Sequence, residues 1–451
     1  MSIRFKNILD SPCGIRFIFS KLNLSSPLSV SVLMDSRISL SISEISQNYK
    51  DLEEFCSLFN EGGTLYSIKD KIRLKLSLLK DIRNSLLRIK GGSTAGDIEL
   101  FEIKLLCLVN NDIRLLLGER LINTVKLHCL EDIADLLDPQ GSRIGSFYVY
   151  DEYSKELKDL RRALKDQDSY TGDNLSKLSE LEDDIRDELT RKIKKRIDVV
   201  EESIYNLAKI DILIAKSEQL SDLSLSIPNI SDLTTSFKGL FNPEIAEILS
   251  MKKSVYQPVD ISFSCSEPLL ITGANMGGKS LTLKTIALAQ YLFQFGFGIP
   301  ATESSIVPVS SVFLLSGNEQ NQKRGLSSFA AEVKRVNKML DAVSSGDLVL
   351  SLTDEPASTT NPTEGSALTS ALIRVLTGKR VMSVLTTHYN ISGNLCKKMR
   401  VKGFDNGRMN YELLVYSGDD APMEALRVAE TLCADKEWIR IAKEELIKLK
   451  S

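Results

Sequence analysis

Residue types that carry metal or redox chemistry are scarce in this 451-residue chain. It has two histidines, which excludes a histidine-rich metal centre. Its seven cysteines are scattered singly, with no Cys-x-x-Cys pair and an odd total, which excludes a disulfide framework or a zinc ribbon and indicates a reducing, cytoplasmic location. A net charge of -3, from 57 Lys+Arg and 60 Asp+Glu, argues against a protein that coats nucleic acid through bulk charge.

Long apolar runs and targeting signals are also missing. The most apolar window, residues 281–300, is interrupted by Lys284, Gln290 and Gln294, so we predict no membrane span and no membrane partner. The first residues show no basic stretch ahead of an apolar core, so no signal peptide is expected. The 43% apolar and 26% charged content is typical of a soluble globular protein, and the length predicts about three domains.

The first half of the sequence predicts an all-α core with long lever helices. Residues 1–45 mix short apolar runs with Ser and Pro and are interpreted as a small domain or a set of strands, of uncertain fold. Over 46–220 the pattern is helical: apolar stripes with three- and four-residue spacing predict one helix over 65–86 and another over about 175–220. The second would be a rod of roughly 60 Å, typical of paired or lever helices. Acidic residues outnumber basic ones over 151–220, which favours a solvated surface.

The second half predicts a different architecture. Residues 221–260 are rich in Ser, Asn and Pro and are interpreted as a linker and the start of the next domain. Over 261–420 short apolar runs alternate with helical segments, which predicts an α/β domain with a mostly parallel sheet. Asp405-Asn406-Gly407 within it predicts a hairpin. Residues 421–451 predict two terminal helices.

The most specific motif lies at the start of the α/β domain. Residues 273–280 satisfy G-x-x-x-x-G-K-[ST] between an apolar run and a helical segment, the context that the motif requires. Backbone N–H groups of such a loop cradle phosphate oxygens, the lysine reaches the β- and γ-phosphates, and the serine hydroxyl ligates Mg²⁺. The motif predicts an ATP and Mg²⁺ site made by Gly273, Ala274, Asn275, Met276, Gly277, Gly278, Lys279 and Ser280.

Two later apolar runs end in residues suited to phosphate chemistry. The run over 348–352 is followed by Asp354 and Glu355. Asp354 would hold Mg²⁺ directly or through water, and Glu355 would orient or deprotonate the attacking water. The run over 381–385 is followed by His388, which we interpret as a contact to the γ-phosphate or its water, although a lone histidine is more often structural.

The order of these motifs and their residue sequences resemble those of the ATPase domain of the MutS family, a branch of the ABC-type ATPases. Residues 272–280 resemble the family's T-G-P-N-M-G-G-K-S, residues 327–332 resemble S-T-F-M-x-E, and residues 387–389 match T-H-Y. Residues 208–213 are similar to the A-x-x-D-V-L that closes the family's lever segment. The terminal helices resemble its dimerising helix-turn-helix, and the match is specific across about 255–390.

The resemblance implies a composite ATP site in a homodimer, or in a heterodimer with a MutS-like paralogue. One subunit would contribute the P-loop, Asp354, Glu355 and His388, and the other would contribute Ser327 toward the γ-phosphate as a catalytic residue. Tyr256 falls roughly where the family stacks an aromatic ring on adenine. ATP-driven closure would then move the long helices on a macromolecular client.

Departures from the family pattern bear on that client. The chain is much shorter than the MutS proteins of mismatch repair, and residues 1–45 offer no mismatch-reading segment. Where the family reads I-G-R-G-T-S-T-Y-D-G, residues 356–365 read P-A-S-T-T-N-P-T-E-G. This variant resembles MutS-like ATPases that reactivate cobalamin-dependent lysine or ornithine aminomutases, which favours a protein client, a corrinoid aminomutase. Duplex DNA, in mismatch repair or recombination, is the alternative, and the acidic far end of the rod, with Asp166, Asp168 and Asp173, opposes it.

Overall fold

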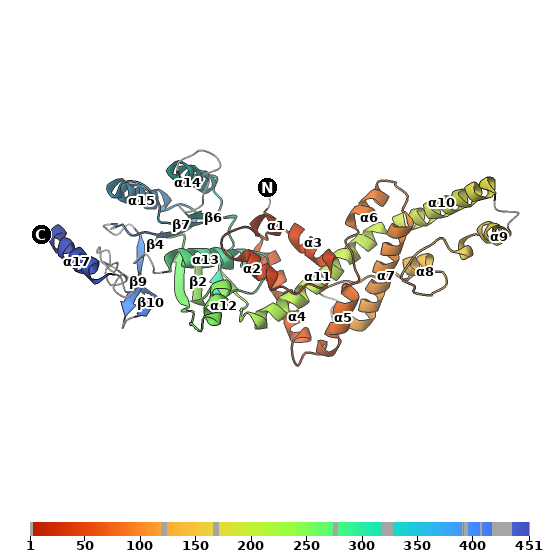
Figure 1. Cartoon of the computed structure of the whole chain (residues 1–451), viewed down its shortest axis with the longest axis horizontal. Helices are drawn as coiled ribbons and strands as arrows, with labels where there is room; N and C mark the ends of the chain where they lie inside the picture. The colour runs from red at the N-terminus through yellow and green to blue at the C-terminus, as the bar shows by residue number, and fades with distance from the viewer. Residues whose placement is uncertain are drawn as a thin grey trace.

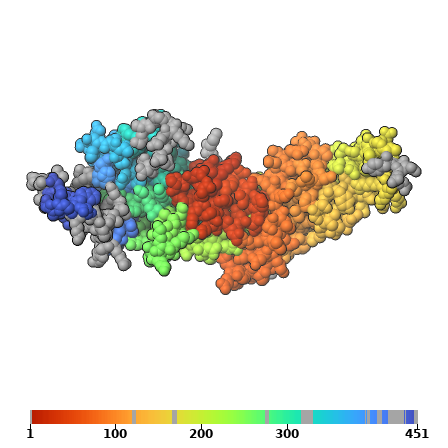
Figure 2. Space-filling view, viewed as in Figure 1, coloured from red at the N-terminus to blue at the C-terminus, as the bar shows by residue number. Residues whose placement is uncertain are grey.

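The molecule is elongated, with a helical arm at one end and an α/β domain at the other (Figure 1). The computed structural model describes residues 3–118, 124–165, 171–273, 278–316, 328–389, 391, 396–405, 408–416 and 435–450. In the space-filling view the N-terminal residues, in red, lie midway along the molecule, between the α/β domain and the arm (Figure 2).

The helical part begins at the N-terminus. Residues 1–45, for which a set of strands was one interpretation, form helices instead, because Ser26 caps a helix at Pro27 and Ile15 and Ile18 bury one helical face. The elements up to residue 137 are α1 (Phe5–Ile8), α2 (Ile15–Ser20), α3 (Pro27–Asp35), α4 (Ile42–Phe59), η1 (Tyr66–Ile68), α5 (Lys69–Leu76), α6 (Arg83–Lys90), α7 (Asp97–Leu117) and α8 (Glu131–Leu137).

The predicted helix over 65–86 is wrong as a single element, because residues 77–82 connect α5 to α6 without forming a helix. Leu79 and Ile82 in this connection are buried like the helical residues on either side. The apolar spacing therefore continues through a non-helical segment, which is why the periodicity predicted one helix.

The predicted continuous helix over 175–220 is also wrong. Two helices, α10 (Gly172–Lys194) and α11 (Ile197–Asp222), are separated by a turn at Lys195 and Arg196. The N–H of Arg196 bonds to the carbonyl of Ile193 at 2.9 Å, which tightens the last turn of α10. The Arg196 guanidinium also forms an ion pair at 2.8 Å with Asp132 of α8, which holds the turn against the helical core.

The arm beyond this turn is a helical hairpin. A short 3-10 turn, η2 (Asp151–Tyr153), leads into α9 (Lys155–Ala163), which lies beside α10 (Figure 1). Arg161 of α9 donates to the carbonyl of Val149 and forms ion pairs with Asp151 and with Glu182 of α10, at 2.7, 2.7 and 2.8 Å. These partly buried contacts fix α9 on α10 and stiffen the arm.

Residues 221–260 are more structured than a linker. They form β1 (Asn229–Ile230), β2 (Thr234–Leu240), α12 (Pro243–Met251) and β3 (Val259–Ser264). With β5 (Glu303–Ile306) the strands make a four-stranded sheet in the order β1-β5-β2-β3, in which only β1 and β5 run parallel.

A six-stranded sheet forms the centre of the α/β domain, in the order β10-β9-β4-β8-β7-β6. Its neighbours are parallel except for the β9–β10 hairpin, so the predictions of a mostly parallel sheet and of a hairpin after Asp405 are confirmed. Residues 406–407 of the hairpin lie outside the described residues. The strands are β4 (Leu269–Thr272), β6 (Ser311–Ser316), β7 (Val349–Asp354), β8 (Val381–Thr386), β9 (Lys397–Asp405) and β10 (Arg408–Val415).

Helices cover both faces of this sheet, as parallel strands require. Leu350 and Met382 face the core that contains α13 (Lys279–Gln294), whereas Val349 and Val381 face α14 (Ser328–Ser344) and α15 (Pro362–Leu376). Helix α17 (Lys436–Lys450) lies at the end of the molecule opposite the arm (Figure 1). The predicted helix before it, within 421–434, lies outside the described residues. Among the residues that the structure describes, none of the helices combines the length and apolarity needed to span a bilayer.

Side chains of the helical part form hydrogen bonds with backbone carbonyls at the C-terminal end of α13. The Tyr49 hydroxyl of α4 donates to the carbonyls of Phe293 and Phe297 at 3.2 and 2.9 Å. The Lys216 ammonium of α11 donates to the carbonyl of Phe295 at 2.7 Å. The helix that begins at the P-loop therefore ends in direct contact with α4 and α11 of the helical part.

Candidate active site

The backbone at both ends of the P-loop adopts conformations that favour glycine. Gly273 has φ +133°, and a Cβ there would lie 3.0 Å from Cβ of Val401 on β9. Gly278 has φ +70° and is the N-cap residue of α13. Both positions therefore suit glycine, and Gly278 stands directly before a helix N-terminus, where backbone N–H groups can bind anions. Residues 274–277, the centre of the predicted loop, lie outside the described residues.

Three predicted residues meet beside this loop. Lys279, the first residue of α13, is 4% exposed and donates to the carbonyl of Gly273 at 2.7 Å. Its Nζ lies 3.6 Å from Oε1 of Glu355, which follows β7. The other oxygen of Glu355, Oε2, lies 3.8 Å from Nδ1 of His388, which follows β8. The Glu355 carboxylate is thus placed between a buried ammonium group and an imidazole ring.

Asp354 and Glu355 are fixed by a residue that sequence reasoning missed. Thr386, at the end of β8, pairs in register with Asp354 at the end of β7. Its buried hydroxyl donates to Oδ1 of Asp354 at 2.7 Å and accepts the N–H of Glu355 at 3.1 Å. One hydroxyl therefore orients the predicted metal ligand and the predicted catalytic carboxylate together. The register of two parallel strands would have identified it, but register cannot be read from one strand.

The other residues that the sequence predicted for the site are Ser280, Tyr256 and Ser327. Ser280 is exposed at the second position of α13, next to Lys279. Tyr256 packs edge-on against Phe241, with ring centroids 6.5 Å apart. Burial raises the pKa of the Tyr256 phenol, and a hydrogen bond to Thr285 on the second turn of α13 opposes that rise. Ser327 lies outside the described residues, so the structure does not test its role.

A second tyrosine, which the sequence did not single out, lies closer to the P-loop. A Cβ on Gly278 would lie 3.2 Å from Cδ1 of Tyr411 on β10. The amide of Gln257 bonds to the carbonyl of Met409 and to the N–H of Tyr411, both at 3.0 Å. The segment after Tyr256 is therefore tied to β10, and both tyrosines lie near the start of α13. Because this packing joins distant parts of the chain, no local pattern predicts it.

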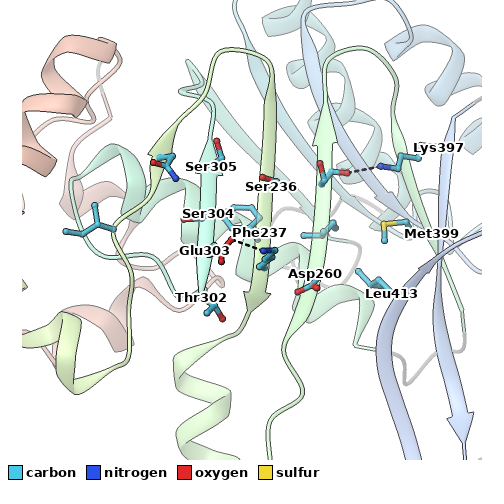
Figure 3. Close-up of a pocket in the computed structure, with 15 residues that line it drawn as sticks. Ser236, Phe237, Asp260, Thr302, Glu303, Ser304, Ser305, Lys397, Met399 and Leu413 are labelled. Atoms are coloured by element: carbon cyan, nitrogen blue, oxygen red, sulfur yellow. Dashed lines mark hydrogen bonds and ion pairs between the residues drawn. The ribbon is translucent and has the colours of Figure 1, made fainter.

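A separate cavity of about 570 Å³ lies over the four-stranded sheet (Figure 3). Ser262, Ser236 and Ser305 are direct register partners on β3, β2 and β5 and form a row along it. Lys238 pairs with Glu303 at 2.9 Å, and Lys397 reaches the carbonyl of Ser262 at 3.5 Å. Of the described residues that line this cavity, none belongs to the predicted ATP site.

Comparison with known proteins adds to this geometry. The family described as MutS domain V matches residues 269–445, the segment that carries β4, the P-loop, Asp354, Glu355 and His388. The protein named Endonuclease MutS2 of Caldicellulosiruptor saccharolyticus is 29% identical over 350 residues, which cover 77% of this chain and 40% of the relative.

Two further relatives carry the same name. The protein from Finegoldia magna is 30% identical over 287 residues, which cover 60% of this chain and 36% of the relative. The protein from Carboxydothermus hydrogenoformans is 27% identical over 414 residues, which cover 89% of this chain and 50% of the relative. The chain thus spans half or less of the length of these relatives, and the similarity reaches into the helical part.

Proposed function

Because residues 269–445 match the family described as MutS domain V, we propose that the chain is a MutS-family ATPase that hydrolyses ATP with Mg²⁺ at the site around Glu355. The observation that carries this proposal is the position of the Glu355 carboxylate between Lys279 and His388. The ends of three parallel strands bring these groups to one edge of the sheet, where α/β domains bind nucleotides.

The described residues fit an ATP and Mg²⁺ site. The glycine conformations at 273 and 278 and the helix N-terminus suit phosphate oxygens, and the buried Lys279 ammonium supplies the cation for the β- and γ-phosphates. Ser280 and Asp354 would hold Mg²⁺, which neutralises phosphate charge when bound. Glu355 would orient or deprotonate the attacking water, and His388 would contact the γ-phosphate or that water.

We further propose that the site is completed by a second subunit, which contributes Ser327. The described helix α17 supports a dimer, since its Trp438 and Ile441 side chains are exposed while Ile439 is buried. Large apolar side chains left on a helix surface are typical of a surface that a partner covers. Either a second copy or a MutS-like paralogue is compatible with this arrangement.

Two substitutions test the ATPase. We expect Lys279→Ala to abolish ATP binding, because it removes the buried cation, and Glu355→Gln to bind ATP but not turn it over. Glu303→Gln, which changes an exposed carboxylate on the other sheet, is the matched control and should hydrolyse ATP normally. Normal hydrolysis by the Glu355→Gln variant would refute the catalytic assignment. Sedimentation with nucleotide bound tests the dimer, and a strictly monomeric species would remove the composite site.

For the client we propose duplex DNA, which was the alternative in the sequence analysis. The relatives are endonucleases by name, and endonucleases act on nucleic acid. Four exposed cations gather at the end of α10, where the arm meets the helical core; they are Arg191, Lys192, Lys194 and Lys195. Exposed Lys and Arg clusters suit phosphate contacts. A corrinoid aminomutase as client rests on the sequence of residues 356–365, on the missing mismatch-reading segment and on the acidic balance of the chain. The relatives' nuclease activity is not carried over, because the chain spans only part of them.

Charge reversal at the end of α10 tests the DNA proposal. Lys194→Glu combined with Lys195→Glu should weaken duplex binding and reduce the slope of log affinity against log salt by about two, if both lysines contact phosphates. Lys50→Glu combined with Lys71→Glu makes the same change in net charge at exposed sites on α4 and α5 and serves as control. Equal weakening by the two pairs would contradict a local contact. Capture of a corrinoid enzyme, without DNA binding at physiological salt, would restore the protein client.

A further inference from the structure

The turn after β7 contains two residues in the left-handed region. Glu355 has φ +46° and Ala357 has φ +57°. Side chains with a Cβ rarely adopt this region, because the Cβ crowds the neighbouring carbonyl oxygen. This chain therefore makes the turn with a residue that resists the conformation.

Both backbone groups of Ala357 are held by side chains from other elements. Its N–H donates to Oε1 of Glu332 on α14 at 2.8 Å. Its carbonyl accepts the hydroxyls of Tyr389 at 3.0 Å and of Thr360 at 2.9 Å. Glu332 and Tyr389 are each 8% exposed, so these bonds are shielded from water.

The surroundings of Tyr389 suit this contact. Its N–H bonds to Oγ1 of Thr387 at 3.0 Å, which fixes the residue after His388. A Cβ on Gly365 of α15 would lie 2.4 Å from the Tyr389 hydroxyl, so α15 leaves room for the ring only because glycine stands there. Burial, with the nearby Glu355 and Glu332 carboxylates, raises the pKa of the Tyr389 phenol, which therefore stays a hydrogen-bond donor.

We propose that Glu332 and Tyr389 are positioning residues that clamp Ala357 in its left-handed conformation and so set the direction of the Glu355 carboxylate. The proposal rests on the proposed ATPase function. Helix α14 begins at Ser328, directly after Ser327. The clamp therefore links the helix behind the proposed partner-facing serine to the turn that carries the catalytic carboxylate.

Steady-state kinetics test the positioning role. Tyr389→Phe removes only the hydroxyl, and Glu332→Ala removes the acceptor of the Ala357 N–H. We expect each to lower kcat on the order of five- to tenfold, as the loss of one buried hydrogen bond allows, with the nucleotide Kd changed less than about twofold. Glu332→Gln keeps an acceptor oxygen and should recover most of the rate. Tyr153→Phe, which removes a tyrosine-to-carbonyl bond of 2.7 Å in the helical part, is the matched control and should leave kcat unchanged.

Ala357→Gly separates the clamp from a general structural role. Glycine adopts positive φ without strain, so the turn then needs less support. In the Ala357→Gly background we expect Tyr389→Phe to lower kcat by less than about twofold. The same loss in both backgrounds would overturn the proposal, and so would a normal kcat for both Tyr389→Phe and Glu332→Ala.

Urea unfolding of the same variants, without nucleotide, tests the clamp independently of catalysis. We expect Tyr389→Phe to destabilise the wild-type background less than the Ala357→Gly background, because without the clamp Ala357 relaxes and releases strain that glycine does not store. Additive effects would overturn the clamp. A wild-type chain that does not hydrolyse ATP would refute the proposed function and the positioning role with it, while the unfolding cycle would still decide whether the clamp exists.

Discussion

Lys216 places an ammonium group inside the junction between α11 of the helical part and the α/β domain. It is 7% exposed on α11, donates to the carbonyl of Phe295 at 2.7 Å and lies 4.0 Å from the centroid of the Phe297 ring. Burial lowers the pKa of Lys216 from its ordinary value of 10.5 to about 7. Because the neutral amine is the form that burial favours, we expect Lys216→Met to stabilise the protein.

The size of this effect follows from the pKa shift. A fall from 10.5 to about 7 corresponds to about 5 kcal/mol, at about 1.4 kcal/mol per pH unit. Below pH 7 both the folded and unfolded chains carry the proton, so the whole destabilisation is present. Between pH 7 and 10.5 the unfolded chain binds more protons than the folded chain, so the free energy of unfolding rises with pH and the destabilisation fades.

The methionine side chain also leaves the Phe295 carbonyl without the Lys216 donor, which costs about 1–3 kcal/mol. We therefore expect Lys216→Met to raise the free energy of unfolding by roughly 2–4 kcal/mol at pH 6. This gain should shrink by about 3 kcal/mol between pH 6 and pH 9.

Urea unfolding at several pH values measures both quantities. Lys238→Met removes a lysine from an exposed ion pair with Glu303 and should leave the free energy of unfolding almost unchanged at every pH. A Lys216→Met variant that is less stable than wild type at pH 6 would refute the reasoning. So would a difference that stays constant with pH, since the pKa shift requires it to change.

Three further substitutions probe the helical part and the site. Asp211→Ala should lower the free energy of unfolding by about 2–4 kcal/mol in urea titrations, because the buried carboxylate accepts the N–H groups of Ser25 and Ser26 at 2.9 and 3.2 Å; an unchanged midpoint would contradict this. Ser327→Ala should lower the hydrolysis rate while the affinity of the monomer for ATP stays the same, and an unchanged rate would argue against a shared site. Tyr411→Ala should raise the Kd of ATP about five- to tenfold but leave that of inorganic tripolyphosphate unchanged, if the ring stacks on the base; equal changes would indicate a phosphate-loop defect instead.

The residues of the candidate site were predictable because each motif can be identified from its own short stretch of sequence. Carboxyl ends of parallel strands meet at one edge of a sheet, so a P-loop after β4, a carboxylate at the end of β7 with another directly after it, and a histidine after β8 have to converge. In the structure Lys279, Glu355 and His388 come together, and a side-chain nitrogen or oxygen of each lies within 3.8 Å of a neighbour in the set. Each motif needed only its own strand to be identified.

The features that sequence reasoning missed depend on contacts between distant segments. Thr386 orients Asp354 only because β8 lies beside β7 in one register, and Tyr411 lies beside Gly278 only because the β9–β10 hairpin packs there. The prediction of one continuous helix over 175–220 was wrong for a related reason. Its apolar spacing continues across Lys195 and Arg196, whereas the turn there depends on hydrogen bonds within the last turn of α10 and on an ion pair with α8.

Helix α13 gives the proposed ATPase a physical route from the site to the arm. Its first residue, Lys279, lies against Glu355, and its last, Gln294, is fully buried and donates to the carbonyls of Ser39 and Val309 at 3.0 and 2.9 Å. Tyr49 and Lys216 hold the carbonyls just before and after this end. Closely packed interiors move as units rather than deforming continuously. A shift of α13 at the P-loop would therefore be passed to α4 and α11, and α11 leads through the turn at its N-terminal end into α10. These contacts would support the proposed lever motion of the arm.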